Sequence, residues 1–200
     1  MKIVAVGRNY AEHARELGNE IPEDPVLFMK PASALVTGNG PFVYPNFTSD
    51  VHFEVEIVLR MCKLASQIPV GSASDYYDAF TVGIDFTARD VQSKLKAKGL
   101  PWEIAKSFDG SAPVGEWIPV PANQPIEFSL SQNGAIRQKG TTADMIHGFD
   151  DLIHHMSRYF TLEPGDLVFT GTPAGVGPVS RGDVLEAYIG NQKLLSCKVE

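Results

Sequence analysis

Residues 51–59, Val-His-Phe-Glu-Val-Glu-Ile-Val-Leu, decide the fold class because polar and apolar side chains alternate there with the period of a β-strand. One face carries only apolar side chains, namely Phe53, Val55, Ile57 and Leu59. The other face carries His52, Glu54 and Glu56. Residues two apart on a strand lie roughly 6.5 to 7 Å apart, so one oxygen of each glutamate could reach a shared cation at about 2.1 Å. From alternation alone, a strand with its second face in water is the more common explanation.

Asp85 offers a third carboxylate near the end of a second apolar run, residues 80–84. Functional side chains often gather at such strand ends, on loops that the scaffold holds in place. Three carboxylates without a nearby cysteine suit Mg²⁺ or Mn²⁺, which take oxygen ligands in an octahedron, and they disfavour zinc. The alternative is that Asp85 only caps backbone N–H groups in the turn that follows.

Further strand-like segments surround this stretch, and turn residues separate them. The segments are residues 3–6, 26–29, 80–84, 126–131, 167–170, 184–189 and 194–199. Asn133 and Gly134 predict a hairpin with a type I′ turn, because both accept the positive φ that this turn requires. A similar turn is expected at residues 189–191.

Three helices are predicted. The first is capped by Asn9 and continues through Glu16; Glu12 reaches back to its start, and Gly18 occupies the C′ position after its end. The second opens at Thr87 and ends near Gly99, and the third follows apolar residues at helical spacing from Ile146 to Phe160. Strands therefore outnumber helices, and the sequence predicts an α+β, mostly β fold. We expect a largely antiparallel or mixed sheet folded over on itself, with a few helices at its rim.

Composition narrows the class of protein. The 200 residues contain 44% hydrophobic residues and no repeat or linker, so we expect a single domain over residues 1–200. Seventeen Lys and Arg against 24 Asp and Glu give a net charge of −7, which argues against nucleic acid and anionic membranes as partners. Cys62 and Cys197 lie far apart and indicate neither a zinc site nor a disulfide framework. Without a signal segment or a membrane span, a cytoplasmic location is expected.

Two more sets of polar residues could serve catalysis. His13 and Glu16 are three apart on the first helix and share a face, so the carboxylate could orient the imidazole as a general base. A solvated surface pair is the more common outcome of that spacing. Lys106 is a lone lysine, and such residues are usually solvated surface charges.

The remaining histidines and one glycine-rich segment receive no role. His154 and His155 are adjacent and point to different sides of their helix, whereas the roles of His52 and His147 stay open. Residues 171–177 are rich in glycine but lack the Gly-Lys-Ser/Thr ending of a P-loop, and they lead towards a strand. A nucleotide site is therefore not expected there.

Six segments, taken in this order, resemble the fumarylacetoacetate hydrolase family, and most closely its short, single-domain acylpyruvase branch. The resemblance covers nearly the whole chain. The segments are residues 7–13 (Gly-Arg-Asn-Tyr-Ala-Glu-His), 28–31 (Phe-Met-Lys-Pro), 54–56 (Glu-Val-Glu), 84–92 (Ile-Asp-Phe-Thr-Ala-Arg-Asp-Val-Gln), 106–110 (Lys-Ser-Phe-Asp-Gly) and 170–173 (Thr-Gly-Thr-Pro).

The resemblance implies the β-roll of that family's C-terminal domain, commonly as a homodimer. It implies that Mg²⁺ or Mn²⁺ is held by Glu54, Glu56 and Asp85. It further implies a water-activating pair, His13 with Glu16, on a mobile lid, and it places Lys106 beside the metal. The positions that look like substrate contacts in the family are Arg8, Gln92 and Thr172.

Together, these residue types could catalyse reactions of 2-oxoacids at a divalent metal ion. A 2-oxoacid chelates a divalent ion through its carboxylate and keto oxygens, and the ion, as a Lewis acid, stabilises an enolate at C3. Our first hypothesis is hydrolysis of a C–C bond in a short acylpyruvate, which yields pyruvate and a carboxylic acid. The alternative within the same site is oxaloacetate decarboxylation, or keto–enol tautomerisation of oxaloacetate or isomerisation of another 2-oxo-dioate. A third hypothesis, from another class, is a catalytically silent, metal-stabilised binding protein.

Overall fold

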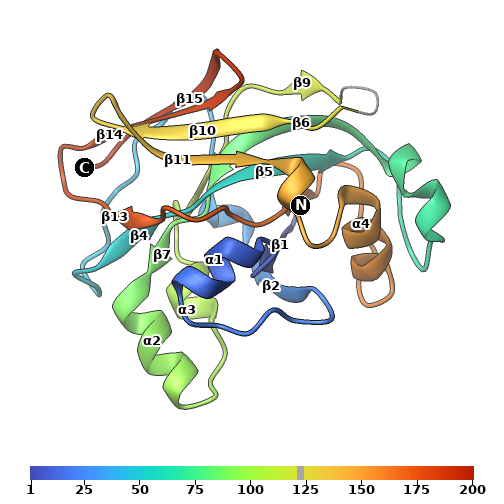
Figure 1. Ribbon diagram of the computed structural model, residues 1–200, viewed down its shortest axis with the longest axis horizontal. Coiled ribbons are helices and arrows are strands. Elements are labelled where there is room, and N and C mark those ends of the chain that lie inside the picture. Colours follow the sequence, from blue (N-terminus) through green and yellow to red (C-terminus); the bar gives the residue numbers. More distant parts are fainter. Residues whose placement is uncertain (121–123) are drawn as a thin grey trace.

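A six-stranded mixed sheet forms the centre of the computed structural model, which describes residues 1–120 and 124–200 (Figure 1). In spatial order its strands are β2 (Val26–Lys30), β1 (Ile3–Gly7), β12 (Leu167–Phe169), β5 (Val55–Met61), β6 (Tyr77–Ile84) and β9 (Ile118–Pro119). Strands β1 and β12 are parallel, and every other neighbouring pair in this sheet is antiparallel. The mixed, mostly β fold predicted from the sequence is confirmed.

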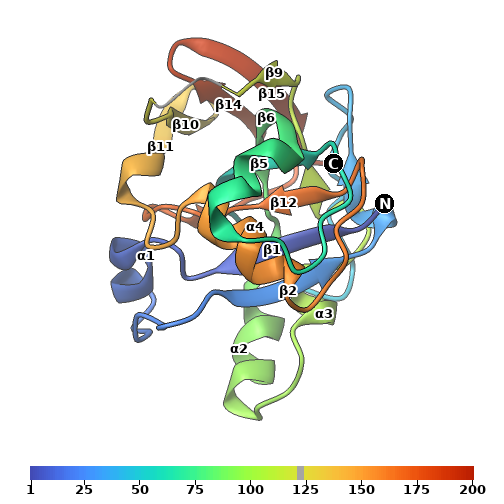
Figure 2. The same cartoon turned by 90° about the vertical axis from the view of Figure 1, so that its right-hand side faces the viewer.

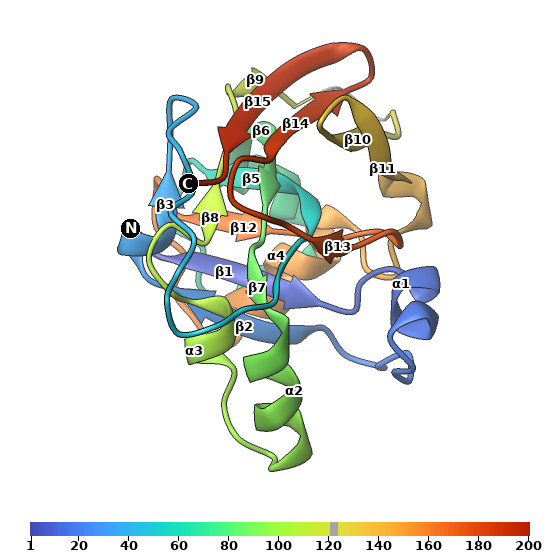
Figure 3. The ribbon, with the colours of Figure 1, turned by 90° about the vertical axis from the view of Figure 1, so that its left-hand side faces the viewer.

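A second, antiparallel sheet packs against the β5–β6 part of the first one, as Figures 2 and 3 show. Its strand order is β11 (Ala135–Thr141), β10 (Glu127–Gln132), β14 (Val184–Ile189) and β15 (Gln192–Lys198). The turn between β10 and β11 contains Asn133 at φ 54° and Gly134 at φ 80°, which confirms the predicted type I′ turn. Gly190, at φ 54°, closes the second predicted hairpin.

Short strands complete the fold, and one of them shows that a strand predicted from the sequence is interrupted. Strands β13 (Gly177–Pro178), β4 (Val51–Phe53) and β7 (Thr87–Ala88) form one small sheet, and β3 (Leu35–Val36) pairs with β8 (Ala112–Pro113). The stretch at residues 51–59 is therefore two strands, because β4 joins the small sheet and β5 joins the central one. Glu54 lies at the break between them, and the prediction of one continuous strand is wrong at this residue.

The helices lie around the sheets, and the predicted three are present together with a fourth. Their bounds are α1 (Ala11–Glu16), α2 (Arg89–Ala97), α3 (Glu103–Lys106) and α4 (Phe149–Ser157). Three short 3₁₀ turns accompany them, namely η1 (Ala32–Ala34), η2 (Val70–Tyr76) and η3 (Thr142–Asp144). Helix α3 contacts β2, and α2 and α3 lie together below the sheets in Figure 1.

Two predicted helix caps are wrong, for a shared reason. Asn9 does not cap α1, whose N-cap is Tyr10, because Asn9 Oδ1 instead accepts a hydrogen bond from the His147 N–H at 2.9 Å. The Asn9 NH₂ group donates to the carbonyls of His147 and Thr170. Thr87 does not cap α2, because its hydroxyl accepts a hydrogen bond from Lys106. In both cases a long-range buried contact takes the polar group that a local motif would otherwise use.

Both faces of β5 are buried. Val55, Ile57 and Leu59 belong to the main core, which also includes side chains of the second sheet and of α4. Val58, on the opposite face, belongs to a second apolar cluster together with Phe169. The face that carries Glu56 is thus covered by protein, so the explanation by a water-exposed strand face is wrong. None of the described helices is long and apolar enough to cross a membrane.

Candidate metal and substrate site

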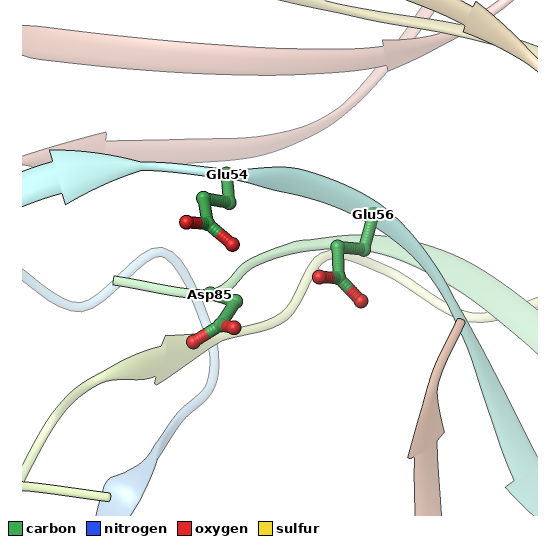
Figure 4. A group of neighbouring side chains, drawn as sticks. All are labelled: Glu54, Glu56 and Asp85. Carbon is green, nitrogen blue, oxygen red and sulfur yellow. The ribbon is translucent and has the colours of Figure 1, made fainter. Parts of the chain in front are cut away.

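Three carboxylates meet where β5 and β6 lie side by side (Figure 4). Glu54 precedes β5, Glu56 lies within it, and Asp85 follows β6. The antiparallel pairing of the two strands and a hydrogen bond of 2.8 Å from the Asp85 N–H to the Glu54 carbonyl hold these positions together. One oxygen from each side chain lies within 4.8 Å of one oxygen of each other, and the residues are only 5%, 1% and 0% exposed.

Three cations surround this carboxylate cluster. The Lys106 ammonium lies 2.8 Å from Glu54 Oε2 and 2.6 Å from Asp85 Oδ2, and it is buried, so the reading of Lys106 as a surface charge is wrong. Lys30 Nζ lies 2.7 Å from Asp85 Oδ1, and Arg89 Nη2 lies 2.5 Å from Glu54 Oε1. Asp85 is therefore an ion-pair partner of two lysines, which argues against its reading as a turn cap.

The two glutamates differ in electrostatic environment. Burial alone would raise the pKa of Glu54, but Lys106 and Arg89 outweigh that cost and hold its pKa well below the usual value. Burial and the neighbouring Asp85 raise the pKa of Glu56 well above the usual value, against the opposing hydrogen bond from the Gly171 N–H. The cluster thus combines a stably ionised carboxylate with one that is short of positive charge.

These properties fit a hard divalent cation. The donor atoms are carboxylate oxygens, which Mg²⁺ and Mn²⁺ prefer, and their spacing permits a common ion. An added cation would favour the ionised form of Glu56, whose raised pKa reports the electrostatic cost of its burial beside Asp85.

A pocket opens above the carboxylate cluster and brings the other sequence candidates together. Its lining includes Glu54 and Glu56 of the cluster, whereas the third carboxylate, Asp85, is fully buried and does not line it. The pocket is also lined by five further candidates, which are Arg8, His13, Gln92, Lys106 and Thr172. Glu16 does not line the pocket but contacts His13, which does. Segments far apart in the chain therefore supply a single cavity.

His13 and Glu16 form the pair expected from their spacing. Glu16 Oε2 lies 3.2 Å from His13 Nδ1, and His13 is buried against the pocket. The Gly175 N–H donates to Glu16 Oε1 at 3.0 Å, so the glutamate is held from both sides. The alternative of a fully solvated pair is wrong for His13.

The glycine-rich segment at residues 171–177 contributes to this site, although it holds no nucleotide motif. The Gly171 N–H donates to Glu56 Oε2 at 2.7 Å, and Gly175 contacts Glu16. Gly171 has φ +100°, and a Cβ atom there would lie 2.7 Å from the Cβ of Asn9, so glycine is required. One backbone loop thus connects the carboxylate cluster to the His13–Glu16 pair.

Several residues of the site were not identified from the sequence. Lys30 and Arg89 lie within the segments that carry the family resemblance, but nothing in their local pattern predicts burial. Gln138 donates to Thr172 Oγ1 and to the Pro173 carbonyl and accepts from the Val55 N–H, so it ties β11 to the site. A polar residue on a hairpin arm gives no such signal before the two sheets are brought together.

Two of the histidines left open or set aside have other partners. His52 Nε2 lies 2.9 Å from Asp50 Oδ1, and His154 Nδ1 lies 2.6 Å from the carbonyl of Ile68. Neither residue lines the pocket above the cluster.

Known proteins resemble this chain over nearly its whole length. The model of the fumarylacetoacetate (FAA) hydrolase C-terminal family matches residues 2–200. Oxaloacetate decarboxylase, mitochondrial, from Dictyostelium discoideum is 47% identical over 192 residues, which is 94% of this chain and 88% of that protein. Human oxaloacetate tautomerase FAHD1, mitochondrial, is 42% identical over 201 residues, which is 99% of this chain and 91% of that protein.

Solved structures share the fold as well. The crystal structure of fumarylpyruvate hydrolase from Pseudomonas aeruginosa in complex with Mn²⁺ and pyruvate superimposes with a TM-score of 0.94 at 39% identity. The match covers 100% of this chain and 89% of that one.

Proposed function

The chain belongs to the fumarylacetoacetate hydrolase family, and on this premise we propose that it is a metal-dependent enzyme that converts oxaloacetate by keto–enol tautomerisation or decarboxylation. The observation that carries the proposal is the buried cluster of Glu54, Glu56 and Asp85, with Lys106 beside it, at the floor of a pocket. Tautomerisation and decarboxylation of a 2-oxoacid share one requirement, the stabilisation of an enolate, which is that of oxaloacetate in the first reaction and that of pyruvate in the second.

Glu54, Glu56 and Asp85 are the residues that would hold Mg²⁺ or Mn²⁺. When bound there, such an ion would supply Lewis-acid polarisation of the carboxylate and keto oxygens of the 2-oxoacid. The related structure with Mn²⁺ and pyruvate supports this choice of ion and of ligand class. Arg8, Gln92 and Thr172, which line the same pocket, are the proposed substrate contacts.

Lys106 contributes charge where the enolate forms. Its ammonium is buried, lies over the ring of Phe28 at 5.2 Å, and is held by Glu54 and Asp85. Burial alone would lower the pKa of Lys106, but Asp85 and Glu54 outweigh that effect and raise its pKa, so the side chain stays protonated at neutral pH. A fixed cation in a dry site stabilises negative charge that develops on the keto oxygen.

His13 moves the proton. In tautomerisation the imidazole accepts the C3 proton, and the imidazolium so formed gives that proton to the enolate oxygen to complete the enol. The reverse sequence restores the ketone. Glu16 orients the ring through Nδ1, which leaves Nε2 for the substrate. In decarboxylation the bond between C3 and the second carboxylate breaks, CO₂ leaves, and the electron pair forms the enolate of pyruvate. This bond cleavage needs no base, and the enolate then takes up a proton at C3 to give pyruvate.

Hydrolysis of an acylpyruvate is the second candidate. It is favoured by the buried His13–Glu16 pair, which could deliver a water to the acyl carbonyl, and by the likeness to fumarylpyruvate hydrolase. The relatives with oxaloacetate in their names give the first candidate more support.

We also propose that the protein is a homodimer, as the family resemblance implies. The sequence predicts a cytoplasmic location, whereas both named oxaloacetate enzymes carry the word mitochondrial in their names.

A panel of assays with saturating Mg²⁺ tests the proposal. Oxaloacetate enol decay, oxaloacetate decarboxylation, and hydrolysis of acetylpyruvate and fumarylpyruvate are measured as separate rates, with and without chelator. We expect a metal-dependent oxaloacetate reaction to be the fastest. Faster acylpyruvate hydrolysis would select the second candidate, and the absence of all turnover would leave the metal-stabilised binding protein.

A further inference from the structure

Two further cationic side chains line the pocket, and their ion pairing differs from that of the cations around the carboxylate cluster. Lys30, Lys106 and Arg89 each form an ion pair with Glu54 or Asp85. Arg8 and Lys96 line the same pocket, yet none of the ion pairs formed within residues 1–120 and 124–200 includes either of them. The pocket thus has positive charge that the protein's own carboxylates do not neutralise.

Lys96 is held in place by a neutral group. Its ammonium donates to Asn19 Oδ1 at 2.9 Å. Asn19 follows α1, and its N–H bonds to the Ala14 carbonyl in the turn that closes that helix at Gly18. The amide oxygen orients the ammonium without cancelling its charge, so the charge remains available to an anion in the pocket.

The surroundings of Lys96 are themselves positive. Arg8, Arg89 and Lys96 line the same pocket, and burial together with the two arginines lowers the pKa of Lys96. Arg8 adopts φ 61°, a left-handed conformation that is strained for a non-glycine residue. Such strain at a pocket-lining residue is typical of functional sites, and an anion would relieve the repulsion between the cations.

We propose that Lys96, with Arg8 beside it, binds the second carboxylate of a dicarboxylic 2-oxoacid and so determines specificity for dianionic over monoanionic substrates. The inference rests on the proposed function, because it takes the first carboxylate and the keto oxygen of the substrate to lie at the carboxylate cluster. The C3 substituent then extends along the pocket wall. An oxaloacetate presents a carboxylate at that point, whereas the monoanionic four-carbon analogue presents a methyl group.

Binding of a matched pair of stable analogues tests the inference. Racemic malate and racemic 2-hydroxybutyrate share a four-carbon skeleton and a chelating 2-hydroxyacid group, and they differ only in the second carboxylate. Their affinities for the Mg²⁺-saturated protein are measured by isothermal titration calorimetry. We expect wild type to bind malate roughly tenfold or more tightly, which is the scale of a charge-assisted hydrogen bond.

The variants separate charge from structure. Lys96→Met should bring the preference for malate below about threefold, and Lys96→Arg, which keeps the charge, should retain most of it. Lys98→Met is the matched control, because Lys98 follows the same helix, is exposed and does not line the pocket. It should keep the wild-type preference.

Two results would overturn the inference while the proposed function stands. They are equal binding of both analogues by wild type, and a full preference for malate in Lys96→Met. If metal-saturated wild type bound neither analogue, the chelation on which the proposed function depends would also be wrong.

Discussion

The carboxylate cluster and the His13–Glu16 pair face the same pocket but are built in opposite ways. The cluster of Glu54, Glu56 and Asp85 lies within or directly next to the paired central strands β5 and β6, is buried, and forms ion pairs with three cationic side chains. His13 and Glu16 lie on the six-residue helix α1, and Glu16 is bound there by a backbone N–H of a glycine-rich loop.

The difference in construction suggests a division of labour. Electrostatic stabilisation of an enolate requires preorganised charge, which a packed sheet supplies. Proton transfer requires a base that reaches different atoms in different substrates, and short helices and loops vary more readily than central strands. We therefore expect the cluster to serve every reaction of this site, and the His13–Glu16 pair to select among them.

The largest effect should come from breaking the cluster. Glu56→Gln preserves the acceptor for the Gly171 N–H but removes a charged ligand, so Mg²⁺-dependent turnover of oxaloacetate and of acylpyruvates should fall below detection. Steady-state rates over a range of Mg²⁺ concentrations measure this. Turnover restored to the wild-type rate by excess Mg²⁺ would show that other residues suffice to hold the ion and that Glu56 only strengthens its binding.

The next largest effect should separate the two regions by reaction. His13→Ala should lower tautomerisation and acylpyruvate hydrolysis by roughly 10² to 10⁴, the range for loss of a general acid–base group, and should spare decarboxylation in relative terms. Lys106→Met should slow all three reactions together, because each passes through the enolate. The three rates are compared for each variant under saturating Mg²⁺.

The division of labour would be contradicted if the two variants changed the rates of the three reactions in the same way. Equal losses in all three reactions for His13→Ala would place His13 with the cluster. A loss confined to one reaction for Lys106→Met would remove Lys106 from the shared step.

A smaller effect, on stability, should distinguish the two glutamates of the metal-free protein. Glu54→Gln leaves Lys106 and Arg89 short of a buried partner and should destabilise the fold by about 3 to 5 kcal/mol. Glu56→Gln removes a carboxylate that burial and Asp85 disfavour, so it should leave the metal-free fold unchanged or more stable. Urea unfolding at several pH values, in chelator, measures both.

The two variants should also differ in how their stability relative to wild type changes with pH. Between the ordinary glutamate pKa of 4.5 and the raised pKa of Glu56, the folded state holds a proton that the unfolded state loses, so stability falls as pH rises. The stability gain of Glu56→Gln over wild type should therefore grow as pH rises through this window, by about 1.4 kcal/mol per pH unit. The contribution of Glu54, whose pKa is lowered, is present above pH 4.5 and is lost as pH falls through the folded pKa. Parallel pH profiles of the two variants would contradict this contrast.

The sequence predicted the fold class and the principal strands because strand alternation and turn residues are local signals. It missed the break at Glu54, since which sheet a segment joins depends on partners far away in the chain, and it misassigned the caps Asn9 and Thr87 for the same reason. Local spacing left exposed and buried explanations open for Glu56 and Lys106. Tertiary packing decided between them, and it also recruited Lys30, Arg89 and Gln138, which no local pattern distinguishes.

Binding of Mn²⁺ tests the central claim most directly, because it needs no assumption about the substrate. Electron paramagnetic resonance titration should show a single Mn²⁺ ion bound per chain in wild type. His13→Ala should bind it with nearly unchanged affinity, and Glu56→Gln should bind it far more weakly. Wild-type Mn²⁺ affinity in Glu56→Gln, or no Mn²⁺ binding by the wild-type protein, would contradict the assignment of the carboxylate cluster as the metal site.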